Sequence, residues 1–180
     1  VMKASGHSWK NVILNSGVLT TTIGHSLTVQ KKMVADEIKT WPGYREVPER
    51  LNITAQTLDK QITSGNGASI AFKDADGGIS YTELNDRVCG MATGLQGLGI
   101  SETDHVLIRL PNCIEFIISF LALVKIGAVP VLQNSLLGAS EVAYVREHSD
   151  AVAAISLHDI ADPVRALADD LPRGVIVARG

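Results

Sequence analysis

The chain has 180 residues, of which 46% are hydrophobic, and its formal net charge is −3. This length and apolar content suffice for one sizeable core but not for two full domains. No basic surface is available to supply the phosphate contacts that dominate nucleic-acid affinity, so nucleic acid is excluded as an expected partner.

The first 35 residues contain four lysines and no acidic residue, and they are rich in serine, threonine, glycine and asparagine. A targeting leader is similarly poor in acids, but leaders to organelles favour arginine, and the apolar stretch Val12–Leu14 is too short for a secretory signal. We therefore expect residues 1–40 to form a poorly structured extension and residues 41–180 to form the folded part.

Two cysteines, Cys89 and Cys113, lie among apolar residues, and neither has a CxxC partner or a histidine at metal-ligand spacing. We expect two reduced core thiols and a cytoplasmic location. The most apolar run, Ile114–Val124, is shorter than the roughly 18 apolar residues that a spanning helix needs, which predicts a buried helix and no membrane partner.

Regular elements are predicted from about residue 52 onward. A short helix over 55–62 is ended by a glycine-containing turn at 63–67, a strand follows at 68–72, and a second turn is expected at 74–78.

The clearest helix begins at Ser80, because Ser80 and Glu83 have the spacing of a capping box, in which each side chain accepts from the other residue's amide. Gly99 follows where a left-handed C-terminal residue belongs. One apolar face is predicted for this helix, made of Leu84, Val88, Met91, Ala92, Leu95 and Leu98.

Strands and helices then alternate to the end of the chain, with Asn112 as an expected helix cap and Pro130 as an indication of an edge strand, a bulge or the start of a strand. This alternation predicts an α/β fold in which a parallel sheet is flanked by helices on both faces. The predicted strands are 105–110, 128–132, 151–157 and 174–178, and the predicted helices are 112–126, 140–148 and 159–170.

Five blocks occur together in an order and spacing that resemble the N-terminal part of acyl- and aryl-CoA ligases of the adenylate-forming superfamily, the AMP-dependent synthetases and ligases. Three further features resemble the benzoate–CoA ligase branch: Leu51–Ile53 before a helix, Asn134–Leu137, and Tyr144 with His148–Asp150. The resemblance covers about 41–178. The five blocks are Ile79–Leu84, Leu98–Ile100, Val106–Asn112, Phe116–Leu123 and Gly127–Val131.

The resemblance implies that residues 41–180 are the first subdomain of the large N-terminal domain of an acid–CoA ligase. It also implies a reaction in which a carboxylic acid attacks Mg-ATP to give an acyl-adenylate, after which CoA displaces AMP. The phosphate loop, the ATP motifs and the catalytic lysine of such enzymes are absent from these 180 residues. We therefore predict an inactive fragment with no catalytic, cofactor-binding or metal-binding residues of its own, and with surface left free for self-association.

Two other functions stay open at this point. A related enzyme could transfer an aryl-adenylate to a carrier protein instead of CoA, and a non-enzymatic α/β module could bind a partner.

Several motifs could be mistaken for functional sites. The run Thr63–Ala68 is expected to be a turn, and Gly94-x-x-Gly97-x-Gly99 is expected to close a helix, so neither should bind phosphate. Three histidine–aspartate neighbours are expected to be caps and turns: Asp104–His105, His148–Asp150 and His158–Asp159. For Arg109 and Lys125, which could touch a nucleotide or CoA phosphate in a complete enzyme, solvated surface positions are favoured.

Overall fold

A computed structural model describes residues 48, 50–74 and 77–178. The contacts divide the chain into two units, with the boundary in the sequence between Leu51 and Asn52. The second unit, residues 52–180, has the fold described below. The predicted extension over residues 1–40 lies outside the described residues.

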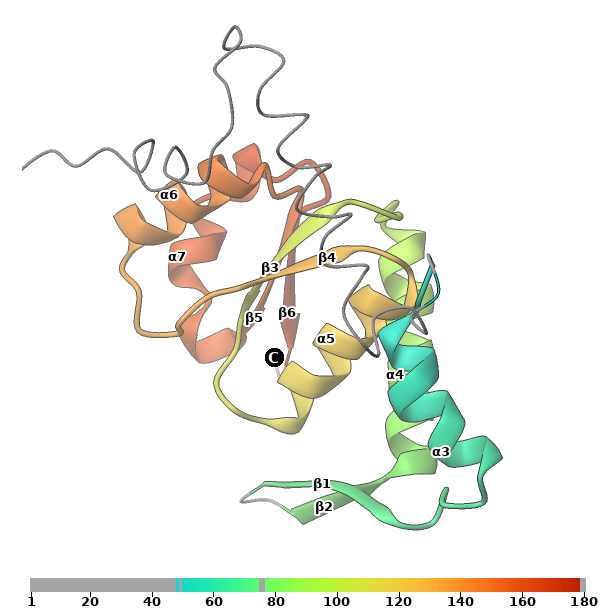
Figure 1. The fold of residues 1–180 in the computed structure, drawn as a ribbon. Coiled ribbons are helices and arrows are strands. Elements are labelled where there is room, and N and C mark those ends of the chain that lie inside the picture. The colour runs from blue at the N-terminus through green and yellow to red at the C-terminus, as the bar shows by residue number, and fades with distance from the viewer. Residues whose placement is uncertain (1–47, 49, 75–76, 179–180) are drawn as a thin grey trace, which may run out of the picture. The chain divides into compact units, whose positions relative to one another are not determined.

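The centre of this unit is a four-stranded parallel sheet, in the order β4, β3, β5, β6 (Figure 1). Each strand was predicted from its apolar run, and β4 lies at an edge, which is one of the three positions that Pro130 indicated. The strands are β3 (His105–Arg109), β4 (Val129–Leu132), β5 (Ala153–Leu157) and β6 (Val175–Ala178).

Helix α4 (Tyr81–Gly97) begins with the predicted capping box, in which the Glu83 amide donates to Ser80 Oγ at 3.2 Å. The chain leaves the helix through Gly99, whose φ of +81° favours glycine. The predicted face was wrong at Leu98, which is 48% exposed because it is the C-cap residue and no longer follows the helical face. The fully buried face consists of Leu84, Val88, Ala92 and Leu95.

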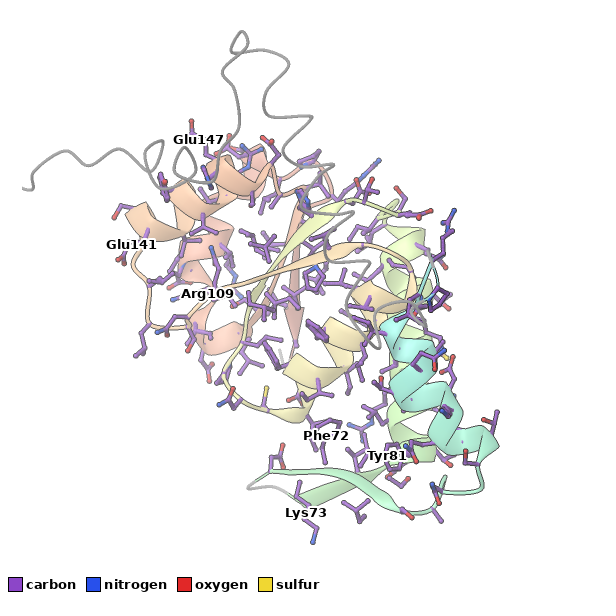
Figure 2. The ribbon with its side chains drawn as sticks, viewed as in Figure 1. Phe72, Lys73, Tyr81, Arg109, Glu141 and Glu147 are labelled. Atoms are coloured by element: carbon purple, nitrogen blue, oxygen red, sulfur yellow. The ribbon has the colours of Figure 1, made fainter. Side chains whose placement is uncertain are left out.

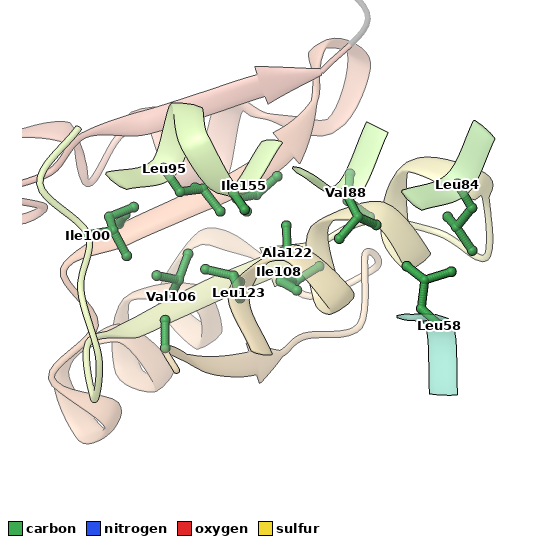
Figure 3. Packing of buried hydrophobic residues seen from close by; sticks show 14 of the residues in the cluster. Leu58, Leu84, Val88, Leu95, Ile100, Val106, Ile108, Ala122, Leu123 and Ile155 are labelled. Carbon is green, nitrogen blue, oxygen red and sulfur yellow. The ribbon is translucent and has the colours of Figure 1, made fainter. Parts of the chain in front are cut away.

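Helix α5 (Ile114–Lys125) packs beside α4 on the same side of the sheet (Figure 1). Its N-cap is Cys113 and not Asn112, and no side chain caps it. None of the helices in 50–74 and 77–178 combines the length and apolar character that crossing a membrane requires. Figure 3 shows the core between these helices and the sheet, which includes Leu84, Val88, Leu95, Val106, Ile108, Leu123 and Ile155.

The opposite face of the sheet is covered by α6 (Ala139–Ser149) and α7 (Asp162–Arg165). The continuous helix predicted over 159–170 was wrong, since the segment forms two 3₁₀ turns, η3 (His158–Ile160) and η4 (Ala168–Asp170), around the one-turn α7. Pro163 lies in the first turn of α7 and lacks the amide with which a helix from Asp159 would continue. The second core includes Leu107, Val142, Ala154, Val164 and Leu171.

A separate antiparallel hairpin joins β1 (Ile70–Asp74) to β2 (Gly77–Ser80). The sequence predicted β1 two residues too early and missed β2, because the paired glycines Gly77 and Gly78 are typical of a turn and not of a strand.

The predicted helix before this hairpin is present as the π-helical turn η2 (Ala55–Asp59) followed by α3 (Lys60–Thr63). It is fixed to the end of α5, where Asn52 Nδ2 donates to the carbonyl oxygens of Val124 and Lys125 at 3.1 and 3.0 Å. These bonds satisfy carbonyl groups that a helix end leaves without an internal partner.

Candidate functional site

Three polar side chains gather at the carboxyl ends of the parallel strands. Arg109 ends β3 and pairs with Ser156 of β5. Gln133 lies just beyond the end of β4, and its main-chain amide donates to the carbonyl oxygen of Ile108. Neighbouring strands in register point their side chains to the same face, so the three residues form one layer, on the face covered by α6 and α7. In open α/β sheets this edge is where ligands bind, which makes the layer the candidate site.

Arg109 is buried, with 4% of its surface exposed, so the expected solvated position was wrong. Its Nη1 donates to the carbonyl oxygen of Asn134 at 2.9 Å, and its Nε donates to that of Ile160 at 3.2 Å. Figure 2 shows the side chain on the side of the sheet that carries α6 and α7. Burial lowers the pKa of the guanidinium, and no carboxylate within the described residues pairs with it.

Gln133 is 8% exposed, and neither atom of its side-chain amide has a hydrogen-bond partner within the described ranges. Both atoms are also shielded from solvent. Ser156 is fully buried and donates from Oγ to the carbonyl oxygen of Arg109 at 3.2 Å. As far as the described residues extend, the layer therefore contains an unneutralised charge and an unsatisfied side-chain amide, both of which cost free energy where they lie.

The arrangement can position chain segments and hold positive charge, but it has no base beside a nucleophile. Arg109 links the segment after β4 to the segment after β5 through the two carbonyl groups that it contacts. In the part of the chain that the structure describes, no three histidine, cysteine, aspartate or glutamate side chains group as metal ligands.

The turn that resembles a phosphate loop uses most of its own amides. The amides of Ser64, Gly65 and Asn66 donate to the carbonyl oxygens of Lys60, Ile62 and Gln61, respectively. A phosphate loop must instead offer such amides to its ligand. The interpretation of Thr63–Ala68 as a turn is confirmed.

The second glycine motif closes α4, as predicted. The amides of Leu98 and Gly99 donate back to the carbonyl oxygens of Gly94 and Gln96, and no amide of this helix end points outward as it would at a helix start.

Of the three histidine–aspartate neighbours, Asp104–His105 reaches the His148–Asp150 segment, but through the main-chain carbonyl of Ser149 and not through a histidine or aspartate side chain. His105 Nδ1 lies 2.6 Å from the carbonyl oxygen of Ser149, His148 stacks on Tyr144, and the exposed His158 lies 3.3 Å from Asp159. These are contacts at element ends, as the sequence predicted.

Lys125, like Arg109, is not simply solvated. Its Nζ contacts Asp59 Oδ1 at 2.9 Å, and 26% of its side chain is exposed. Like the bonds of Asn52, this ion pair holds η2 against the end of α5.

An apolar groove of about 310 Å³ opens among η2, β1, α4 and α5. Phe72 and Ile53 line it and are 41% and 51% exposed, and Tyr81 also reaches it; Figure 2 labels Phe72 and Tyr81. Its other lining residues are Thr57, Leu58, Leu84, Ile117, Phe120 and Leu121.

Comparison with known proteins places this fold in a family. The sequence model of the family described as "AMP-binding enzyme" matches residues 34–179. The 4-hydroxybenzoate–CoA/benzoate–CoA ligase of Rhodopseudomonas palustris is 30% identical over 121 residues, which cover 67% of this chain and 22% of that protein. The salicyl-AMP ligase/salicyl-S-ArCP synthetase of Mycobacterium tuberculosis is 42% identical over 65 residues, or 36% of this chain and 12% of that protein.

A solved structure agrees with these sequence relatives. The crystal structure of a benzoate CoA ligase from Burkholderia xenovorans matches with a TM-score of 0.67 at 25% identity, over 72% of this chain and 26% of that one. The chain thus spans about a fifth to a quarter of the length of these two ligases. From the match over residues 34–179 and the shared fold, we conclude that the chain belongs to the AMP-binding enzyme family.

Proposed function

We propose that this chain is the first α/β part of an AMP-forming ligase that activates an aromatic carboxylic acid and transfers it to CoA in the cytoplasm. The observation that carries the proposal is the likeness to benzoate–CoA ligases in both sequence and fold. The domain division that we propose has residues 41–180 as the start of the large N-terminal domain and residues 1–40 as an extension to it.

The proposed reaction has two steps, and each defines what the protein must supply. The acid's carboxylate oxygen attacks the α-phosphorus of ATP and pyrophosphate leaves; the CoA thiolate then attacks the acyl carbon and AMP leaves. Both steps need donors that stabilise developing negative charge on the transferring group. Arg109 is a buried cation, but its Nε and Nη1 already donate to carbonyl groups. The role that we propose for the described residues is therefore to support the sheet, and that none of them is catalytic stays a prediction.

A second candidate is an enzyme that loads the acyl-adenylate onto a carrier protein. The observation that favours it is the 42% identity to the salicyl-AMP ligase/salicyl-S-ArCP synthetase, although over fewer residues. A third candidate, from another class, is a non-enzymatic α/β binding module. The gene sequence downstream of Gly180 distinguishes the module from the ligases, because an in-frame phosphate loop supports a ligase and a stop codon supports the module.

The experiment that tests the proposal measures pyrophosphate release from Mg-ATP with and without benzoate. We expect the 180-residue chain to show no acid-dependent release, and the protein encoded by the full reading frame to show benzoate-dependent release followed by benzoyl-CoA formation. Acid-dependent release by the 180-residue chain would overturn the supporting role. Failure of the full-length protein to activate any aromatic acid would overturn the substrate class, and acyl transfer to a carrier protein but not to CoA would favour the second candidate.

We also propose that the 180-residue chain associates with itself. Among the residues that the structure describes, no strand pairs with the outer edges of β4 and β6, and the groove exposes apolar side chains such as Ile53 and Phe72. Unpaired strand edges and exposed apolar patches both favour association between chains.

A further inference from the structure

The turn that resembled a phosphate loop contains a feature that phosphate binding does not explain, the dipeptide Asn66-Gly67. We propose that Asn66 is a site of spontaneous deamidation, in which the amide nitrogen of Gly67 closes a succinimide ring. The proposal is independent of the ligase function, because it depends only on this turn.

Three observations on the turn support the reaction. Asn66 is exposed, so water reaches its side chain. The main-chain amide of Gly67, which is the attacking group, donates no hydrogen bond within the described residues, whereas the amides of Ser64, Gly65 and Asn66 all donate to carbonyl groups. The attacking nitrogen therefore breaks no hydrogen bond within the described chain as it reacts.

The packing against α4 makes glycine the residue that fits after Asn66. A Cβ on Gly67 would lie 2.6 Å from Thr82 Oγ1, and the Gly67 carbonyl oxygen accepts from the Thr82 amide at 2.9 Å. Glycine lacks the side chain that would hinder the approach of its nitrogen to the neighbouring carbonyl carbon. The fold thus retains the residue that leaves the reaction least hindered.

The chemistry needs only water and is balanced at each step. The Gly67 nitrogen loses its proton to solvent and bonds to Asn66 Cγ; the Cγ–Nδ2 bond breaks, and the nitrogen leaves as ammonia. Water then adds to either carbonyl carbon of the ring and opens it, which gives aspartate or isoaspartate and adds one negative charge. Because the attacking amide must lose its proton, the rate rises with pH.

The isoaspartate product places the side-chain carbon in the main chain and lengthens it by one methylene. The Asn66 carbonyl oxygen accepts from Ser69 at 2.9 Å, and Asn66 Nδ2 donates to Gln61 Oε1 at 2.8 Å. The reaction removes the bond to Gln61, because Nδ2 leaves as ammonia. It also displaces the Asn66 carbonyl group from the Ser69 amide. We expect the connection between α3 and β1 to loosen as a result.

The chain supplies matched internal controls, because every other asparagine in the described residues precedes a residue with a side chain. These are Asn52 before Ile53, Asn85 before Asp86, Asn112 before Cys113 and Asn134 before Ser135. Asn52 is held by more bonds than Asn66, since its Nδ2 donates to two carbonyl groups whereas that of Asn66 donates to one side-chain oxygen.

The test incubates the folded 180-residue chain at mildly alkaline pH and follows each asparagine peptide by mass spectrometry, with ammonia release as a second readout. We expect the Asn66 peptide to be lost first and to yield both aspartate and isoaspartate forms, faster at higher pH. Asn66→Gln should abolish this product while circular dichroism stays unchanged. The proposal is overturned if the Asn66 peptide stays intact, or if it reacts no faster than the four control peptides.

Discussion

Arg109 Nη1 lies 2.9 Å from the carbonyl oxygen of Asn134, a residue 25 positions later in the chain. The same guanidinium reaches Ile160 through Nε, so a single buried side chain holds the segments that follow β4 and β5, the two strands on either side of β3. A hydrogen bond from a charged donor contributes about 1.5–3 kcal/mol, whereas an unpaired buried charge costs several. The two hydrogen bonds therefore offset part of the cost of burying the charge, and both segments depend on Arg109 for their position.

Replacing Arg109 by methionine tests which of these effects is larger. Methionine removes the charge and fills similar space, but it leaves two carbonyl groups without their donor. We expect Arg109→Met to lower the free energy of unfolding by about 1–3 kcal/mol, the cost of leaving buried polar groups unpaired. Urea unfolding measures this change, and Arg165→Met is the control, since the Arg165 guanidinium pairs with the exposed Asp162. A more stable Arg109→Met variant would show that charge burial outweighs the two hydrogen bonds.

Much of the fold could be predicted because its determinants are local in sequence. The start of α4 follows from Ser80 and Glu83, three residues apart, and its end follows from Gly99. The position of Arg109 could not be predicted in this way, since its partners are main-chain carbonyls 25 and 51 residues away, and a carbonyl group carries no sequence signal. The one available signal was an arginine directly after the apolar run Val106–Ile108 of the predicted strand.

Two glycines associated with α4 should respond to alanine in opposite ways. Gly99 has a φ of +81°, and an added Cβ would lie 3.0 Å from Arg173 Nη1. Left-handed backbone costs a non-glycine residue about 1–2 kcal/mol, so Gly99→Ala should destabilise the protein by at least that amount. Gly94 lies within the helix with no atom within 4 Å of an added Cβ, so Gly94→Ala should stabilise by about 0.5–1 kcal/mol. Thermal unfolding of both variants checks the signs, and equal shifts would contradict the assignment of the helix end.

The capping box predicts a defined loss on removal of one hydroxyl group. Ser80→Ala leaves the Glu83 amide without its acceptor and should cost about 0.5–2 kcal/mol. Ser140→Ala, in the first turn of α6 and exposed, is the matched control and should change stability by less than about 0.5 kcal/mol. Chemical denaturation of the two variants compares them, and equal losses would refute a specific role for Ser80.

The apolar groove predicts dye binding and concentration-dependent self-association. Phe72→Thr keeps a residue suited to a strand but removes an aromatic ring from the groove, so it should reduce the fluorescence of a bound hydrophobic dye and shift sedimentation toward monomer. Leu136→Thr removes an even more exposed apolar residue that does not line the groove, and it should change dye binding less. A monodisperse wild-type monomer that binds no dye would contradict the proposed association.

Cys113, the N-cap residue of α5, predicts a dependence of stability on alkaline pH. Burial raises the pKa of its thiol above the ordinary value of 9.0, and the hydrogen bond and charge of Glu115 act in the same direction. The unfolded chain then loses this proton at lower pH than the folded chain, so this thiol lowers the free energy of unfolding as pH rises through 9.0 and above. Cys113→Ala should make the free energy of unfolding fall less steeply with pH. Cys89→Ala should leave the contribution of Cys113 to this fall unchanged. Urea unfolding across this pH range measures both slopes, and a wild-type slope retained by Cys113→Ala would assign the pH dependence to other groups.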